Sequence, residues 1–443
     1  MSVSIFGLLA AVLGFAGQLL GIRFLIFCFV ISALFISTSA ISLGGKPVLV
    51  TFVFLGFIIL YLLRVKNFGQ HLLQMLQNNS AVKWFAIFVL YSILVSFITP
   101  AIFGGEVRVV SLFMGKIEAG FLTFGGGHIA QIIYAVMALV IVLAVSSMVS
   151  LDRRILEYFA LAILWMGALN IVFAVADLLN FYIGFPDIIN VFRNAEYAML
   201  DQSFGAVRRV AGIFPETSAF SGFTAALACF AYFLYRSRVY PQLSFWVTVL
   251  STVFVLIATS TSGYVGLAMF GLLIALSELP NIKVGTMSKV VFFSALLSVA
   301  VALVLSTVFY KEAYMIFEHA VLNKLDSDSG VERMQWNEYA WGDFLETYGL
   351  GVGLGGNRAS SYLLVLLSNV GLVGTLLYVA AFVSVLKGSV ETNTPTQSVI
   401  GAAAKRSLCV AIFPAMASAT APWQGAIFYT FLALANTKDK QGQ

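Results

Sequence analysis

Charged residues are scarce in this chain. Only 10% of its 443 residues are Asp, Glu, Lys or Arg, whereas 60% are hydrophobic and the mean hydropathy is +0.96. Soluble globular domains carry charge at about a quarter of their positions. The composition therefore excludes a water-soluble globule and predicts a polytopic membrane protein.

Cysteine and histidine are also rare. The chain has three of each; the cysteines lie inside apolar runs and the histidines are far apart in the sequence, at Cys28, Cys229, Cys409, His71, His128 and His319. This pattern predicts neither a disulfide framework nor a metal site. The N-terminal residues lack the basic segment and the small-residue cleavage site of a signal peptide, so we expect them to be retained as a membrane segment.

Long apolar runs are abundant. Those that can cross a hydrocarbon layer of about 30 Å lie at 4–20, 24–42, 48–64, 82–103, 130–149, 155–182, 217–235, 243–259, 262–279, 288–309 and 361–386. A last stretch, 407–436, is broken at Pro414 and Pro422 and is either one kinked span or two short ones. We predict an all-α transmembrane helical bundle of about 12 or 13 spans, in which residues 1–443 form one integral membrane domain.

The loops between these runs alternate in charge. One side carries fifteen basic residues against five acidic ones; the basic residues are Arg23, Arg64, Lys66, Lys83, Arg153, Arg154, Arg236, Arg238, Lys283, Lys289, Lys387, Lys405, Arg406, Lys438 and Lys440. The positive-inside rule places this side in the cytoplasm. The basic balance of the chain therefore indicates topology and contact with anionic lipid, and we expect no nucleic acid as a partner.

The longest polar segment, residues 310–360, is consequently predicted to be external. It contains twelve of the 45 charged residues. Its first half predicts short amphipathic helices, with apolar residues at helical spacing at Tyr314, Phe317, Val321 and Leu325. Its second half predicts an aromatic helix that runs into the glycine turn GVGLGG. A loop of this length and aromatic content is typical of a folded functional segment.

A second external segment, residues 204–223, opens a predicted span. Pro215 and Glu216 form a helix start in which the positive end of the helix dipole favours the carboxylate, so Glu216 is either a structural helix start or a functional acid. The preceding Arg208 and Arg209 are suited either to lipid headgroups or to bidentate binding of a phosphate.

Hydroxyl groups mark a third external segment, IATSTSGYVGL at 257–267. Ser260 and Ser262 can satisfy backbone groups in a tight helix turn or contact a substrate. Taken alone, this segment does not distinguish the two roles.

Arginines flank the glycine turn within the long loop. Arg333 precedes the aromatic helix and Arg358 follows the turn, which contains Gly353, Gly355 and Asn357. Glycines let backbone N–H groups approach an anion closely, so this region is a candidate phosphate site. The turn lacks the lysine of a nucleotide-binding P-loop.

The combination of these segments resembles the O-antigen polymerase and O-antigen ligase family. Within this family, the sequences of the motifs most resemble those of exopolysaccharide polymerases. The pattern R-x-x-G-x-F-x-E runs from Arg209 to Glu216, STSGY follows at 260–264, and R…GVGLGGNRASS…LLSNVGLVG runs from Arg333 to Gly374, all in this order and at external positions. The resemblance covers roughly residues 125–380.

The resemblance implies a bacterial inner-membrane glycosyltransferase that works on the periplasmic face without metal, nucleotide sugar or other cofactor. The expected substrate is an undecaprenyl-pyrophosphate-linked glycan, and the expected partners are membrane lipids, a chain-length regulator and a flippase. By implication Arg209, Glu216 and Arg333 are catalytic, with both arginines on the pyrophosphate. Substrate-binding positions are Arg208, Ser260, Ser262, Gly353, Gly355, Asn357 and Arg358.

Two departures from the family pattern favour a polymerase over a ligase. Gly263 stands where many members carry an arginine, and Ser360 and Ser361 stand where ligases place a histidine. For the base that accepts the acceptor's proton we name Glu216, with Glu338 and Asp343 as alternatives.

A competing functional class is a lipid-linked oligosaccharide transporter, which would place ionisable residues in mid-membrane. Asp177 is the only Asp, Glu, Lys or Arg well inside a predicted span. A passive scaffold would not explain arginines beside a glycine turn.

Overall fold

The computed structural model describes residues 2–43, 46–113, 116–195, 203–204, 207–278, 328–388 and 393–436. Within these residues the chain is predominantly helical and its strands form only small antiparallel sheets. The predicted all-α, polytopic fold class is confirmed. The span expected at 288–309 and the amphipathic helices expected around 314–325 lie outside the described residues.

Six described helices are long and apolar enough to cross a membrane, namely α5, α6, α7, α8, α14 and α15. Shorter apolar helices are α1, α2, α3, α9 and α10. The helix bounds are α1 Ile5–Leu20, α2 Ile22–Ser32, α3 Val50–Leu62, α4 Phe68–Asn78, α5 Ser80–Phe103, α6 Gly126–Leu151, α7 Ile155–Ile183, η1 Asn190–Phe192, α8 Thr217–Arg236, α9 Pro241–Ile257, α10 Thr261–Glu278, α13 Asp328–Glu346, α14 Tyr362–Lys387, α15 Pro395–Ser418 and α16 Ala426–Leu434.

Short strands, which the all-α prediction does not include, lie at the predicted external ends of the helices. They are β1 (Ser2–Val3), β2 (Ser39–Leu43) and β3 (Lys46–Leu49) in one sheet, β4 (Arg108–Phe113) with β5 (Lys116–Phe121), and β6 (Ser203–Phe204) with β7 (Val207–Arg208).

The expected span at 24–42 is therefore wrong in its second half. Helix α2 ends at Ser32, because the polar residues that follow make partners outside a helix. Thr38 Oγ1 donates to the carbonyl of Phe192, and the N–H of Ser39 donates to Asn194 Oδ1.

The C-terminal stretch at 407–436 forms two segments rather than one kinked span. Helix α15 starts earlier than expected, because Thr394 accepts the N–H of Gln397 as an N-cap and Pro395 occupies the first helical position. Helix α16 follows after a break that contains Pro422.

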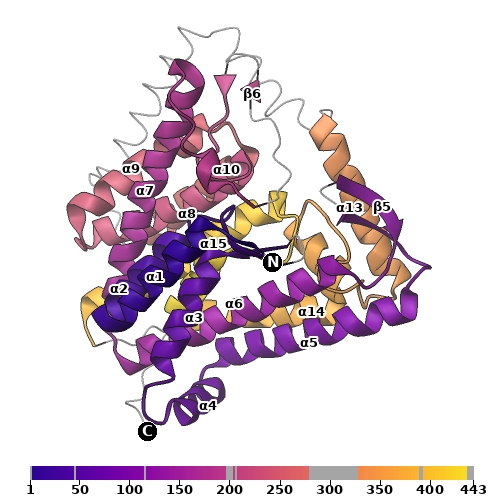
Figure 1. Ribbon diagram of the computed structural model, residues 1–443, viewed down its shortest axis with the longest axis horizontal. Coiled ribbons are helices and arrows are strands. Elements are labelled where there is room, and N and C mark those ends of the chain that lie inside the picture. The colour runs from indigo at the N-terminus through magenta and orange to yellow at the C-terminus, as the bar shows by residue number, and fades with distance from the viewer. Residues whose placement is uncertain are drawn as a thin grey trace.

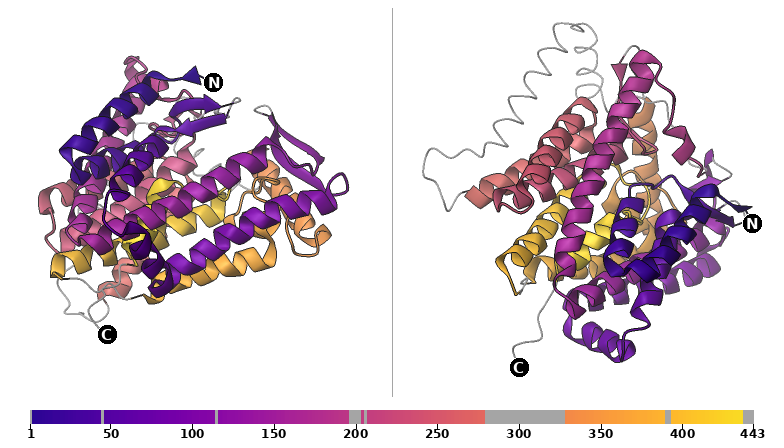
Figure 2. Two further views of the ribbon diagram at one scale, coloured as in Figure 1. Left: turned by 60° about the horizontal axis from the view of Figure 1, so that its bottom comes forward. Right: turned by 60° about the vertical axis from the view of Figure 1, so that its left-hand side comes forward.

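Two neighbouring groups of helices position the site, and α1, α2, α3 and α7 pack on one another as a further set. Helices α5, α6 and α14 run side by side, and α8 packs against α9, α10 and α15 (Figures 1 and 2). Helix α13 and the β4–β5 hairpin cover one end of the first group, at the right of Figure 1.

Helix ends predicted to be cytoplasmic meet at the opposite end of the bundle. Three side-chain contacts join them: Asn79 to Asn436, Arg236 to Ser277, and Gln397 to Glu157. This pairing agrees with the alternation of helix directions that the loop charges predict. The assignment of that end to the cytoplasm stays a prediction from the charge rule.

Candidate functional site

The glycine turn enters the bundle and packs against a break in α14. Gly371 interrupts this helix with a φ of 67°, so carbonyls just before it lack helical partners. The carbonyl of Ser368 accepts the N–H of Val352 at 2.7 Å, and that of Asn369 accepts the N–H of Gly353 at 2.9 Å. The kink and the turn thus satisfy each other's backbone groups, which a lipid environment requires.

Close packing, rather than anion binding, explains the glycines of this turn. Gly353 has a φ of +88°, and a Cβ there would lie 2.8 Å from the Cα of Ser96 on α5. Gly355 has a φ of +76°, and a Cβ there would lie 2.5 Å from the carbonyl oxygen of Gly127 on α6. Neither position accommodates a side chain.

The N–H groups of the turn are already engaged. That of Leu354 donates to Ser96 Oγ at 2.8 Å, and that of Gly355 donates to Asn369 Oδ1 at 2.7 Å. Since the N–H of Gly353 is also bonded, the expected cradle of backbone N–H groups for a phosphate at Gly353 and Gly355 is not what the structure contains. Asn357 is buried, and its Oδ1 accepts the N–H of Val110 on β4.

Helix α13 presents one face to the residues after the turn. The guanidinium of Arg358 lies over the ring of Trp336, 4.9 Å from its centre, and the N–H of Ser360 donates to Asn337 Oδ1 at 2.8 Å. Arg333 is three and four residues before Trp336 and Asn337, so all three share a helix face. From this face the charge of Arg333 acts on Arg358.

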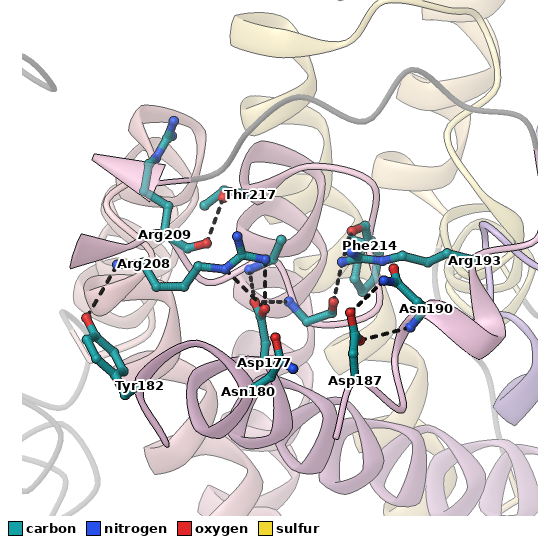
Figure 3. A network of polar contacts seen from close by, with 12 residues as sticks. Asp177, Asn180, Tyr182, Asp187, Asn190, Arg193, Arg208, Arg209, Phe214 and Thr217 are labelled. Atoms are coloured by element: carbon teal, nitrogen blue, oxygen red, sulfur yellow. Dashed lines mark hydrogen bonds and ion pairs between the residues drawn. The ribbon is translucent and has the colours of Figure 1, made fainter. Parts of the chain in front are cut away.

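The adjacent arginines of the second segment point in different directions (Figure 3). Arg208 turns into the protein, where its Nη2 lies 2.9 Å from Asp177 Oδ1 in an ion pair. Arg209 points away from that pair. Arg208 is therefore committed to a structural contact, which counts against its predicted role as a substrate ligand.

Arg209 reaches the hydroxyl-rich hairpin between α9 and α10. Its Nη2 donates to the carbonyl of Thr259 at 3.4 Å. Ser260 and Ser262 are buried there with their hydroxyls 2.8 Å apart, and Ser262 also donates to the carbonyl of Ser218 on α8. These bonds show the serines holding the hairpin to α8; contact with a substrate stays a prediction.

Gly263 has no room for the arginine that many members of the resembled family carry at this position. A Cβ there would lie 2.7 Å from the Cβ of Ser221 on α8. The departure noted in the sequence is thus matched by close helix packing.

Two buried arginines from distant segments, Arg209 and Arg358, each interact electrostatically with Arg333 and Glu216. Burial lowers the pKa of Arg209, and Arg333 lowers it further, whereas the carboxylate of Glu216 opposes the shift. Burial likewise lowers the pKa of Arg358, with Glu216 opposing and Arg333 reinforcing the shift. The structure therefore gathers Arg209, Arg333, Arg358 and Glu216, which we call the arginine cluster. Its three positive charges exceed its single negative charge.

Glu216 occupies the N-cap of α8, as the helix-start interpretation predicts. Its side chain makes no capping hydrogen bond to that helix. The carboxylate is half-buried and electrostatically coupled to two arginines of the cluster. Because the carboxylate does not cap the helix, it is available to accept a proton. The catalytic role of Glu216 stays a prediction.

The alternative bases on α13 differ in environment. Glu338 is exposed. Asp343 is buried, and burial, reinforced by the charge of Glu346, raises its pKa to about 8. A carboxyl that holds its proton at neutral pH is a poor proton acceptor, which weakens Asp343 as a candidate base.

Some residues that build the site escaped the sequence interpretation. The side chain of Asn369 accepts the N–H of Gly355 and donates to the carbonyls of Asn357 and Val365. Ser96, which accepts the N–H of Leu354, lies on a helix that no motif marked. Asp177 was noticeable as a single charge in a span, which is a signal for function. Arg193, which contacts the loop before α8, carried no such signal.

Among the residues that the structure describes, no group of three His, Cys, Asp or Glu side chains is placed to hold a metal ion. Comparisons with protein-family models, with curated proteins and with solved structures find no match for this chain.

Proposed function

We propose that this membrane protein is a glycosyltransferase that joins lipid-linked oligosaccharide repeats, using undecaprenyl-pyrophosphate-linked glycan as donor on the periplasmic face. The observation that carries the proposal is the arginine cluster, assembled from residues far apart in the sequence at the predicted external end of the helices. Its residues coincide with the positions that the family resemblance marks.

The charge of the cluster suits a diphosphate diester, which has one negative charge on each phosphate. Three arginines against one glutamate leave an excess of positive charge that such a group neutralises. Arginine can pair with two phosphate oxygens at once, and a fixed cation requires no metal. Glu332 also acts on Arg358, but it is exposed and its effect is weaker than those of Glu216 and Arg333.

The proposed reaction is displacement at the anomeric carbon of the donor. The bond from this carbon to the diphosphate oxygen breaks, and its electron pair leaves with the diphosphate. A hydroxyl oxygen of the acceptor forms the new bond, and its proton passes to the carboxylate of Glu216. Negative charge grows on the diphosphate in the transition state, where preorganised arginines stabilise it; loss of one such group typically costs about a hundred- to a thousandfold in rate.

Asp177 does not favour a transporter, although it is an ionisable residue in a predicted span. Its carboxylate is bonded to Arg208 and to the loop before α8. We therefore keep transport, together with transfer to a lipid A core by a ligase, as outcomes of the following experiment.

A strain that lacks the gene tests the proposal. We expect no long polymer and an accumulation of single repeats on undecaprenyl pyrophosphate in the periplasmic leaflet. Mass spectrometry of the extracted carrier lipid, with an impermeant lectin that reports the leaflet, makes the measurement. Single repeats trapped in the cytoplasmic leaflet would instead identify a flippase, and long chains still attached to the carrier would identify a ligase.

A further inference from the structure

The loop between Arg209 and Glu216 is held by a carboxylate from another helix. Asp177, near the end of α7, is buried, and its Oδ2 accepts the N–H groups of Ala211 at 2.8 Å and Gly212 at 3.0 Å. Its Oδ1 accepts from the guanidinium of Arg208. One carboxylate thus bonds two residues of the loop and the arginine just before it, as Figure 3 shows.

An arginine from a second segment holds the same loop through its carbonyls. Arg193, which follows η1, donates from Nη2 to the carbonyl of Gly212 at 2.6 Å and to that of Phe214 at 2.8 Å. Arg193 is half-buried. Burial lowers its pKa, and the charge of Asp177 opposes this shift more strongly than any other charge. Charged donors and acceptors make the stronger hydrogen bonds of proteins.

The loop is also fixed by packing. Val210, Ala211, Ile213 and Phe214 are buried between the two charged ends. Gly212 has a φ of +54°, and the ring of Phe220 lies 3.4 Å from the position of a Cβ there. The backbone from 210 to 214 therefore has a defined path, and that path sets the separation of Arg209 from Glu216.

We infer that Asp177 and Arg193 are positioning residues, which act on the reaction by fixing the loop that carries Arg209 and Glu216. We call the hydrogen bonds of Asp177 and Arg193 to residues 211–214 the clamp. The predicted effect on activity rests on the proposed function, whereas the clamp itself is a property of the fold. Neither residue belongs to the arginine cluster. Their contribution arises because displacement of a catalytic group by about 1 Å can cost about a hundredfold in rate.

The test compares Asp177→Asn with Asp187→Asn in the purified full-length protein. Asp187 is the control, because its hydrogen bonds go to Asn190 and not to the loop (Figure 3). Its charge also acts on Arg193, but less strongly than that of Asp177. Hydrogen exchange reports the clamp without any assay of activity. We expect faster exchange of peptides covering 210–214 in Asp177→Asn, with α7 and α8 still protected, and no change in Asp187→Asn.

Steady-state transfer from a lipid-linked repeat reports the positioning role. We expect kcat/KM to fall about a hundredfold in Asp177→Asn, mainly through kcat, and to be unchanged in Asp187→Asn. Arg208→Lys, which keeps one charged donor for Asp177, should retain more activity than Arg208→Gln. Such rescue would not follow from a role in folding alone.

Unchanged exchange at 210–214 in Asp177→Asn would overturn the clamp. Faster exchange there with full kcat/KM would overturn the positioning role, as would a loss of protection throughout the protein. If the wild-type protein neither transferred glycan nor bound inorganic pyrophosphate, the proposed function would fail, and the exchange measurement would still decide on the clamp.

Discussion

The buried carboxyl of Asp343 makes the stability of the protein depend on pH. Its pKa is raised from the ordinary 3.8 to about 8, first by burial and then by the charge of Glu346. The folded protein therefore binds a proton that the unfolded chain releases above about pH 4. The stability contribution is fully present below the unfolded pKa and is lost as the pH rises through the folded value.

The size of the effect follows from the linkage between proton binding and folding. Each pH unit between the two pKa values changes the free energy of unfolding by about 1.4 kcal/mol for one group. From pH 5 to pH 7 this single carboxyl removes about 2.7 kcal/mol. Asp343→Asn abolishes this dependence, because an amide has no proton to lose in this range.

Thermal unfolding in detergent at pH 5, 6, 7 and 8 measures the prediction. Among the residues that the structure describes, none bonds to Asp343 Oδ2, so the substituted amide brings a constant cost of about 1–3 kcal/mol. The slope against pH, rather than the absolute stability, is therefore the quantity to compare. Glu338→Gln, an exposed change on the same helix, should keep the wild-type slope. Equal slopes in wild type and Asp343→Asn would refute the reasoning.

Three further predictions concern the site and its orientation. Arg209→Ala and Arg333→Ala should each lower transfer about a hundred- to a thousandfold while the protein stays in the membrane. Lysine should rescue neither position, because it lacks the planar guanidinium that pairs with two phosphate oxygens. Full activity of Arg333→Lys in the transfer assay would show that charge alone suffices. Gly353→Ala should destabilise the protein by about 1–3 kcal/mol in thermal unfolding, because a Cβ would meet α5; unaltered stability would contradict the packing role. A cysteine at the exposed Glu106 should react with an impermeant thiol reagent from outside intact cells and one at the exposed Arg154 should not, and labelling of position 154 would reverse the orientation.

Hydrophobic runs were sufficient to predict most of the helices. The expected spans at 82–103 and 155–182 agree closely with α5 and α7, because continuous apolar sequence has few alternatives to a helix in lipid. The run at 24–42 misled because it contains Ser37, Thr38 and Ser39. The carbonyl of Ser37, the hydroxyl of Thr38 and the N–H of Ser39 each bond to the distant segment 192–195. Such partners are set by tertiary structure and leave no periodicity.

The charged residues of the site were predictable as a set, although their individual roles were not. Arg209, Arg333 and Arg358 were selected as arginines at external positions, and the structure brings them together. Arg208 has the same local sequence context as Arg209, and only the position of Asp177 separates their roles. The glycine turn has the composition of an anion site, yet its N–H groups are engaged by Ser96 and by the kink in α14.

We propose that the arginine cluster binds a diphosphate on a lipid carrier. Binding of undecaprenyl pyrophosphate and undecaprenyl phosphate to the purified protein in nanodiscs, measured by native mass spectrometry, tests it most directly. Arg108→Gln is the matched control, because Arg108 is exposed at the same end of the molecule and packs on Phe121 outside the cluster.

We expect wild type and Arg108→Gln to prefer the diphosphate by about tenfold or more, since one charge-assisted contact is worth about 1.5–3 kcal/mol. Arg209→Gln and Arg333→Gln should lose this preference. Equal binding of the two lipids by the wild-type protein, or an undiminished preference in both cluster variants, would contradict a diphosphate site at the arginine cluster.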